Sequence, residues 1–114
     1  MSEIGKQLKK GVLEILILKL INRQDMYGYE MIQIMEDKSG GYFKLKEGSL
    51  YPILYRLEDE ELIESYWNKD PAKRTVPRKY YKITKKGSAV LNVYIDEWNE
   101  FLIAAKSLLD EEGK

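Results

Sequence analysis

The chain has 114 residues, 44% of them hydrophobic and 33% charged, and its acids and bases balance to zero net charge, as in a single folded domain with a charged surface. It contains neither cysteine nor histidine, which excludes disulfides and thiolate chemistry and removes the commonest general base and zinc ligand, so we expect no enzyme, no metal and no cofactor. Apolar runs such as residues 15–18 are too short to cross a bilayer and no signal peptide opens the chain, so we expect a cytoplasmic protein without membrane contact.

Two helices are predicted at the start of the chain. Apolar residues recur at helical spacing between Gly5 and Asn22, in a stripe wide enough to be buried on two sides, against the domain core and against a partner helix. The polar run at residues 22–25 ends this pattern. A second helix is predicted from about Tyr27 to Gly40 or Gly41.

A third helix is predicted in the unusual segment KEGSLYPILYRLEDEELI, residues 46–63. Ser49 or a residue just before it is the expected N-cap. If the helix starts at Ser49, Pro52 falls in the first turn, where its missing N–H costs no hydrogen bond. A start at Glu47 would instead cost the helix one bond. The predicted buried face consists of Leu50, Ile53, Leu54, Leu57 and Leu62.

Two short strands joined by a basic loop are predicted next. In the second strand, RKYYKIT, Tyr81 and Ile83 alternate with Tyr80 and Lys82. Residues 66–86 contain eight lysines or arginines and one acid, a local charge of +7 in a neutral chain. Exposed charges act over roughly 10 Å, so such a surface can bind phosphate, although a solvated lysine-rich hairpin is the alternative.

A last helix of about 25 residues is predicted after Thr84, whose side chain would cap it. This helix is too long and too apolar on one side for so small a body to cover, so a second copy of the chain is the expected cover. We expect the dimer interface to contain Leu91, Tyr94, Ile95, Trp98, Phe101, Leu102, Ala105 and Leu108.

The order of three helices, a hairpin and a long helix predicts an α+β fold that is mainly α: a winged helix-turn-helix with a long C-terminal dimerisation helix. The winged helix-turn-helix would occupy residues 1–84, with its recognition helix at about 48–61 and its wing at about 63–84. The dimerisation helix would occupy residues 85–114, and the whole chain would form one compact unit.

Four segments in this order resemble the PadR family of bacterial transcriptional regulators: GVLEILILKLI, MYGYEMIQIME, LKEGSLYPILYRLEDEELIES and RKYYKITKKG. The run EGSLYPILYRLE is the most specific of them. The resemblance covers nearly the whole chain and is to the short branch of the family, which ends in a single long helix. The wing loop departs from the family pattern, because TVPRKYY lacks the glycine that usually precedes the arginines.

The resemblance implies a homodimeric repressor that binds a pseudo-palindromic operator in double-stranded DNA. The four acids at residues 58–61 would repel phosphate, so only the start of the third helix is expected to enter the groove. The expected DNA contacts are Lys46, Ser49, Tyr51, Pro52, Tyr55 and Arg56 in and beside this helix, and Lys73, Arg74 and Arg78 in the wing. A winged helix that binds a protein instead of DNA, through its acidic patch and last helix, is the alternative.

The resemblance also implies a place for an effector. In multidrug-sensing members of the short branch, a tryptophan from each last helix flanks an apolar cavity at the dimer centre. Trp98 stands at the matching place, and Leu8, Val12 and Ile15 lie on the facing part of the first helix. A small planar aromatic or cationic compound would fit between two such indoles, and a Trp98 that only packs in the dimer core is the alternative.

Overall fold

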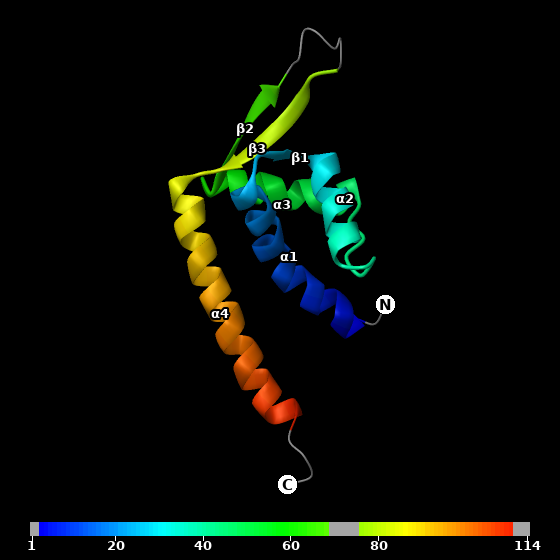
Figure 1. Ribbon diagram of the computed structural model, residues 1–114, viewed down its shortest axis with the longest axis vertical. Helices are drawn as coiled ribbons and strands as arrows, with labels where there is room; N and C mark the ends of the chain where they lie inside the picture. The colour runs from blue at the N-terminus through cyan, green and yellow to red at the C-terminus, as the bar shows by residue number, and fades with distance from the viewer. Residues whose placement is uncertain (1–2, 69–75, 111–114) are drawn as a thin grey trace.

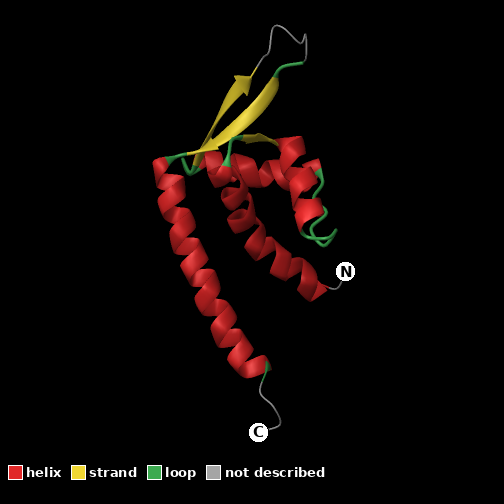
Figure 2. Cartoon of the chain, viewed as in Figure 1, coloured by secondary structure: helices red, strands yellow, loops and turns green. Residues whose placement is uncertain are grey.

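The computed structural model describes residues 3–68 and 76–110. These residues form, in chain order, α1 (Glu3–Arg23), β1 (Met26–Tyr27), α2 (Gly28–Lys38), α3 (Glu47–Asp59), β2 (Ile63–Asn68), β3 (Arg78–Ile83) and α4 (Lys85–Leu109) (Figure 1). Figure 2 shows the strands gathered at one end of the molecule, with the β2–β3 hairpin projecting beyond the helices. The predicted mainly helical winged fold is confirmed. None of the described helices combines the length and apolar character needed to cross a membrane.

The sheet contains a strand that the sequence patterns did not predict. β1 pairs with β3, so the antiparallel order is β1-β3-β2. A strand of two residues is too short to show alternation, so Met26 and Tyr27 could be taken only as the approach to the second helix. The strand ties the start of α2 to the hairpin.

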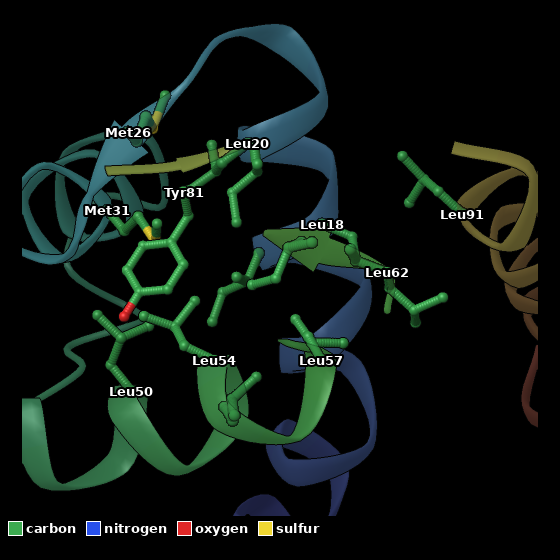
Figure 3. Close-up of a cluster of buried hydrophobic side chains, with 14 of the residues drawn as sticks. Leu18, Leu20, Met26, Met31, Leu50, Leu54, Leu57, Leu62, Tyr81 and Leu91 are labelled. Atoms are coloured by element: carbon green, nitrogen blue, oxygen red, sulfur yellow. The ribbon is translucent and has the colours of Figure 1, made fainter. Parts of the chain in front are cut away.

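The core lies between the sheet and the three N-terminal helices. Tyr81 projects from the sheet toward leucines of α3, with Leu18 of α1 alongside (Figure 3). The predicted buried face of the third helix is confirmed, since Leu50, Ile53, Leu54, Leu57 and Leu62 are all buried. Burying one such side chain stabilises the fold by about 1.5–3 kcal/mol, so this stripe anchors α3 firmly against the sheet.

The start of α3 is the earlier of the two starts that the sequence left open. The helix begins at Glu47 with Lys46 as its N-cap, so Ser49 is the third helical residue and caps nothing. The N–H of Leu50 donates to the Lys46 carbonyl at 3.0 Å. Pro52 therefore lies inside the hydrogen-bonded part of the helix, where it costs one bond. The preceding Phe43 and Leu45 pack against the core, which brings the chain into position to begin the helix before Ser49.

A tight corner joins the wing to α4. The Thr84 hydroxyl accepts a hydrogen bond from the Gly87 N–H at 2.9 Å, which confirms the predicted cap, and donates to the Glu61 carbonyl at 2.7 Å. The Thr84 N–H donates to the Leu62 carbonyl at 3.1 Å. Gly87 faces that same carbonyl so closely that a side-chain carbon there would overlap it. The corner thus fixes the direction in which α4 leaves the wing.

Only the first part of α4 packs on the body of its own subunit. Leu91, one of the predicted interface residues, is 1% exposed within the subunit's own core. Tyr94 and Ile95 are also partly buried against that core. Farther along, Phe101 and Leu108 are 56% and 75% exposed. Periodicity could not separate these cases, because apolar residues that face the core and residues that face a partner share one stripe.

Replacing Gly87 with alanine is expected to lower the free energy of unfolding by about 2 kcal/mol or more, because the new methyl group would meet the Leu62 carbonyl, a backbone atom that cannot rotate away. Urea unfolding followed by circular dichroism measures the change. Gly11→Ala is the matched control, since no atom lies near Gly11 and alanine there should stabilise α1 by roughly 0.5–1 kcal/mol. Equal stabilities of the two variants would contradict the role of the corner.

Candidate nucleic-acid interface

The start of α3 presents a polar and aromatic surface. Lys46, Ser49 and Pro52 are exposed, and Tyr55 is 56% exposed. Tyr51 is half-buried, with its ring 6.1 Å from the ring of Tyr55. The structure therefore places these five predicted residues around the first turns of one helix, at the end where free N–H groups carry partial positive charge.

Tyr51 also joins α3 to α2. Its hydroxyl lies against Gly28, the first residue of α2, where a side-chain carbon would overlap it. Burial, followed by the nearby Glu47 carboxylate and Tyr55, raises the pKa of Tyr51 above its ordinary value. The hydroxyl therefore remains protonated at neutral pH and can donate a hydrogen bond to an anion such as a phosphate oxygen.

A basic groove continues this surface onto α1. The groove has a volume of about 440 Å³ and lies between α1, the linker and α3, beside Ser49 and Pro52. No acid is among its described lining residues. Its basic lining residues are Lys6, Lys9 and Lys10 of α1, Lys44 of the linker and Arg56 of α3.

No sequence pattern had connected the α1 lysines to the third helix. The Lys9 ammonium donates to the Tyr42 carbonyl at 2.8 Å and lies 4.3 Å from the centre of the Tyr42 ring, which holds α1 beside the α2–α3 linker. The sequence alone does show that Lys6, Lys9 and Lys10 share one helical face, because they are spaced three and four residues apart. Which neighbour the face would meet depends on tertiary packing.

Arg56 is directed toward α1. Its Nε donates to the Glu14 carboxylate at 3.0 Å. The pair is substantially exposed to water, so it contributes at most about 1 kcal/mol to stability. Glu14 offsets part of the charge that Arg56 brings to the groove, and the lysines supply most of its positive potential.

Arg78 is the first residue of β3 and lies at the end of the hairpin farther from α4, on the outer face of the sheet. One of its Nη atoms donates to the Tyr27 hydroxyl at 2.9 Å, and the guanidinium carbon lies 4.6 Å from the centre of that ring. Tyr27, Tyr80 and Tyr66 stand opposite one another across the three strands. These contacts hold Arg78 in a defined position.

The far end of this tyrosine row is fixed by a carboxylate. The Tyr66 hydroxyl donates to Asp25 at 2.6 Å, and this bond raises the pKa of Tyr66 to about 12. The Tyr66 and Tyr80 rings stack with centroids 5.8 Å apart. The row therefore keeps its hydrogen bonds through the neutral pH range.

The inner face of the hairpin packs on α3 near Ser65 and extends beyond that helix toward Trp67. The Ser65 hydroxyl donates to the Glu58 carboxylate of α3 at 2.6 Å. Farther out, Lys79 lies 5.7 Å from the centre of the buried Tyr81 ring. Burial raises the pKa of Tyr81 to about 12, and its hydroxyl has no hydrogen-bond partner among the described residues. Trp67, the cross-strand partner of Lys79, is 68% exposed.

Lys73 and Arg74, the other two predicted wing contacts, lie outside the described residues. The expectation that they bind phosphate therefore rests on their charge and on the wing to which they belong. In the described part of the chain, no three acidic residues gather as a set of metal ligands.

The predicted effector residues lie on α1 and α4. Trp98 is half-buried, and its ring stacks on Phe101 with centroids 6.0 Å apart. On α1, Leu8 is exposed, whereas Val12 and Ile15 are partly buried. Within the single subunit, apolar side chains therefore remain exposed on both α1 and α4. These are the two helices on which the effector cavity and the dimer interface were predicted.

Comparison with known proteins connects the whole fold to one family. Residues 17–93 match the profile of the Transcriptional regulator PadR-like family. An uncharacterised protein of Lysinibacillus sphaericus is 41% identical over 99 residues, which cover 85% of this chain and 87% of that protein. A PadR-like transcriptional regulator from Bacillus cereus has a similar structure, with a TM-score of 0.80 and 35% identity over 93% of this chain and 99% of the other. A PadR family regulator from Eggerthella lenta has a TM-score of 0.83 and 29% identity over 97% of this chain and 93% of the other.

Proposed function

The chain belongs to the PadR-like family of transcriptional regulators, which are DNA-binding proteins and not enzymes, and from this premise we propose that it is a repressor that binds a pseudo-palindromic operator as a homodimer. The observation that carries the proposal is the positive surface at the start of α3, where exposed Lys46 and Ser49 border a groove lined by lysines and by no described acid. Two such surfaces in a dimer would meet two half-sites about one helical turn apart and so exclude polymerase.

The start of α3 would enter the major groove. Helix N-termini favour anions, and Ser49, Tyr51 and Tyr55 have hydroxyls that can donate to phosphate oxygens or base edges. Lys46 and the groove lysines would bind the adjacent backbone. The acids at residues 58–61 occupy the other end of the helix and the turn after it, where phosphate would be repelled. This division supports entry by the N-terminal half alone.

The wing would grip the backbone beside the groove. Arg78, held by Tyr27 near the outer end of the hairpin, would supply one charge, and Lys73 and Arg74 would supply two more. Because these contacts are to phosphate, they would strengthen binding to every duplex and would read no sequence directly.

DNA binding is expected to weaken steeply with salt and to depend on Lys46. A gel shift with the DNA upstream of the gene for this chain should show affinity falling by about 10³-fold or more between roughly 50 and 200 mM salt. Lys46→Ala should weaken binding about fivefold and reduce the salt dependence, because one phosphate contact is lost.

Lys106→Ala is the matched control for this measurement, since Lys106 is an exposed lysine near the far end of α4. It should leave the affinity unchanged. Binding that ignores salt, or no binding to any duplex, would reject the repressor and favour a winged helix that binds a protein partner.

The second half of α4 would form the dimer. Its exposed apolar side chains have no cover in the described part of the subunit and follow one another at helical spacing. An apolar surface of this kind on a long projecting helix supports pairing with the α4 and α1 of a second copy. The proposed interface residues are Tyr94, Ile95, Trp98, Phe101, Leu102, Ala105 and Leu108.

Ending the chain before Trp98 is expected to produce a monomer, because most of the proposed interface is removed while the buried core up to Leu91 is kept. Sedimentation equilibrium measures the mass. Far-ultraviolet circular dichroism checks that the winged helix remains folded. A stable dimer of the shortened chain would refute this interface.

An effector would bind at the centre of this dimer. A planar aromatic cation between the two Trp98 rings would gain stacking and roughly 0.5–2 kcal/mol of cation–π energy per ring. Leu8, Val12 and Ile15 would line the apolar walls, and the exposed acids Asp96, Glu97 and Glu100 would favour positive charge nearby. A ligand that prefers a different helix spacing would weaken operator binding by its differential affinity for the two dimer states.

Trp98 fluorescence tests for this ligand. In a Trp67→Phe chain, Trp98 is the only tryptophan, and a planar cation such as an acridinium dye should quench it saturably. The same dye should lower operator affinity in the gel shift. Emission that no dye in a panel of planar cations changes, from an intact dimer, would show that Trp98 only packs.

A further inference from the structure

Trp67 is unusually exposed for a tryptophan. It is 68% exposed, although this residue type is highly buried on average in folded proteins. Alternate residues of a strand share a face, so Trp67 lies on the same face of β2 as Ile63 and Ser65. Ile63 is buried in the core, and Ser65 donates to Glu58 of α3. Trp67 is therefore the next residue outward on the α3 side of the hairpin.

The surroundings of Trp67 combine an aromatic surface with positive charge. Its cross-strand partner is Lys79, which shares its face and lies over the edge of the core at Tyr81. The hairpin projects beyond α3 at this level (Figure 1). We name the pair Trp67 and Lys79 the inner wing surface. Exposed Tyr55 lies on α3, the helix on which this face of the hairpin packs.

Two acids of this region, Glu58 and Glu64, have polar partners of their own. Glu58, the acid of α3 that reaches the inner face, is bound by the Ser65 hydroxyl. Glu64 lies on the opposite face of β2 and is 3.8 Å from the ammonium of Lys82. In the described part of the hairpin, no ion pair joins Lys79 to a carboxylate, so the inner wing surface is suited to an anion.

We propose that Trp67 contacts DNA directly. Its indole packs on the deoxyribose of the strand that passes between α3 and the wing, its Nε1–H donates to a phosphate oxygen, and Lys79 pairs with the same backbone. A sugar–phosphate chain offers an apolar ring face next to an anion, which matches an indole beside an ammonium. This inference rests on the proposed DNA-binding function and adds to it a backbone contact that comes from an aromatic side chain.

Affinity is measured first, with mixed-sequence duplex DNA at low salt and with the DNA upstream of the gene. Trp67→Ala should weaken binding to both duplexes about tenfold, because the contact is to the backbone. Val93→Ala is the control: this side chain is 56% exposed on α4, away from the wing and α3, and its loss should leave affinity unchanged.

Fluorescence then reports on the residue itself. In a Trp98→Phe chain, Trp67 is the only tryptophan. Its emission should shift to the blue and become shielded from acrylamide as either duplex is added, and added salt should reverse both changes.

Three outcomes would overturn the Trp67 contact, and the first would overturn the proposed function as well. If the unaltered chain binds neither duplex, the proposed function and this contact both fall. If it binds, but Trp67→Ala matches Val93→Ala in affinity and Trp67 emission is unchanged in bound Trp98→Phe protein, the contact alone is overturned. A change in Trp67 emission with protein concentration instead of with DNA would also overturn it and would assign Trp67 to a protein contact.

Discussion

The contact between Gly87 and the Leu62 carbonyl, with the Thr84 cap beside it, sets the direction of α4 relative to the wing and α3. It joins the end of β3 to the turn that follows α3, so α3 and α4 form one rigid angle. In a dimer built on α4, that angle would determine the separation of the two recognition helices.

α3 combines structural and functional surfaces within thirteen residues. Its leucine stripe is buried against the sheet, whereas its first turns remain exposed and border lysines from α1 and the linker. Pro52 costs a hydrogen bond but lies close to the exposed start, and Tyr51 fills the space that Gly28 leaves at the start of α2. The burial of one face thus holds the other in place, which reduces the ordering that DNA binding would require.

The two faces of the hairpin are held differently. On the outer face, a row of tyrosines fixes Arg78 through a hydrogen bond and a cation–π contact, and Asp25 fixes the far end of the row. On the inner face, Trp67 projects beyond the core with little cover. A preformed cation on one face and an exposed indole on the other would let a single hairpin contact a DNA backbone over a wide angle, in addition to the charge of the loop at its tip.

The sequence by itself determined the features that local order controls: the helical periods, the leucine stripe of α3, the alternation around Tyr81 and the cap at Thr84. These depend on spacing and on neighbours within one turn, so they could be predicted. Tertiary structure alone decided the pairing of β1, the start of α3 before Ser49 and the position of the α1 lysines beside α3. It also decided that Leu91 is buried within its own subunit, because periodicity shows which face of a helix is apolar but does not show which surface covers it.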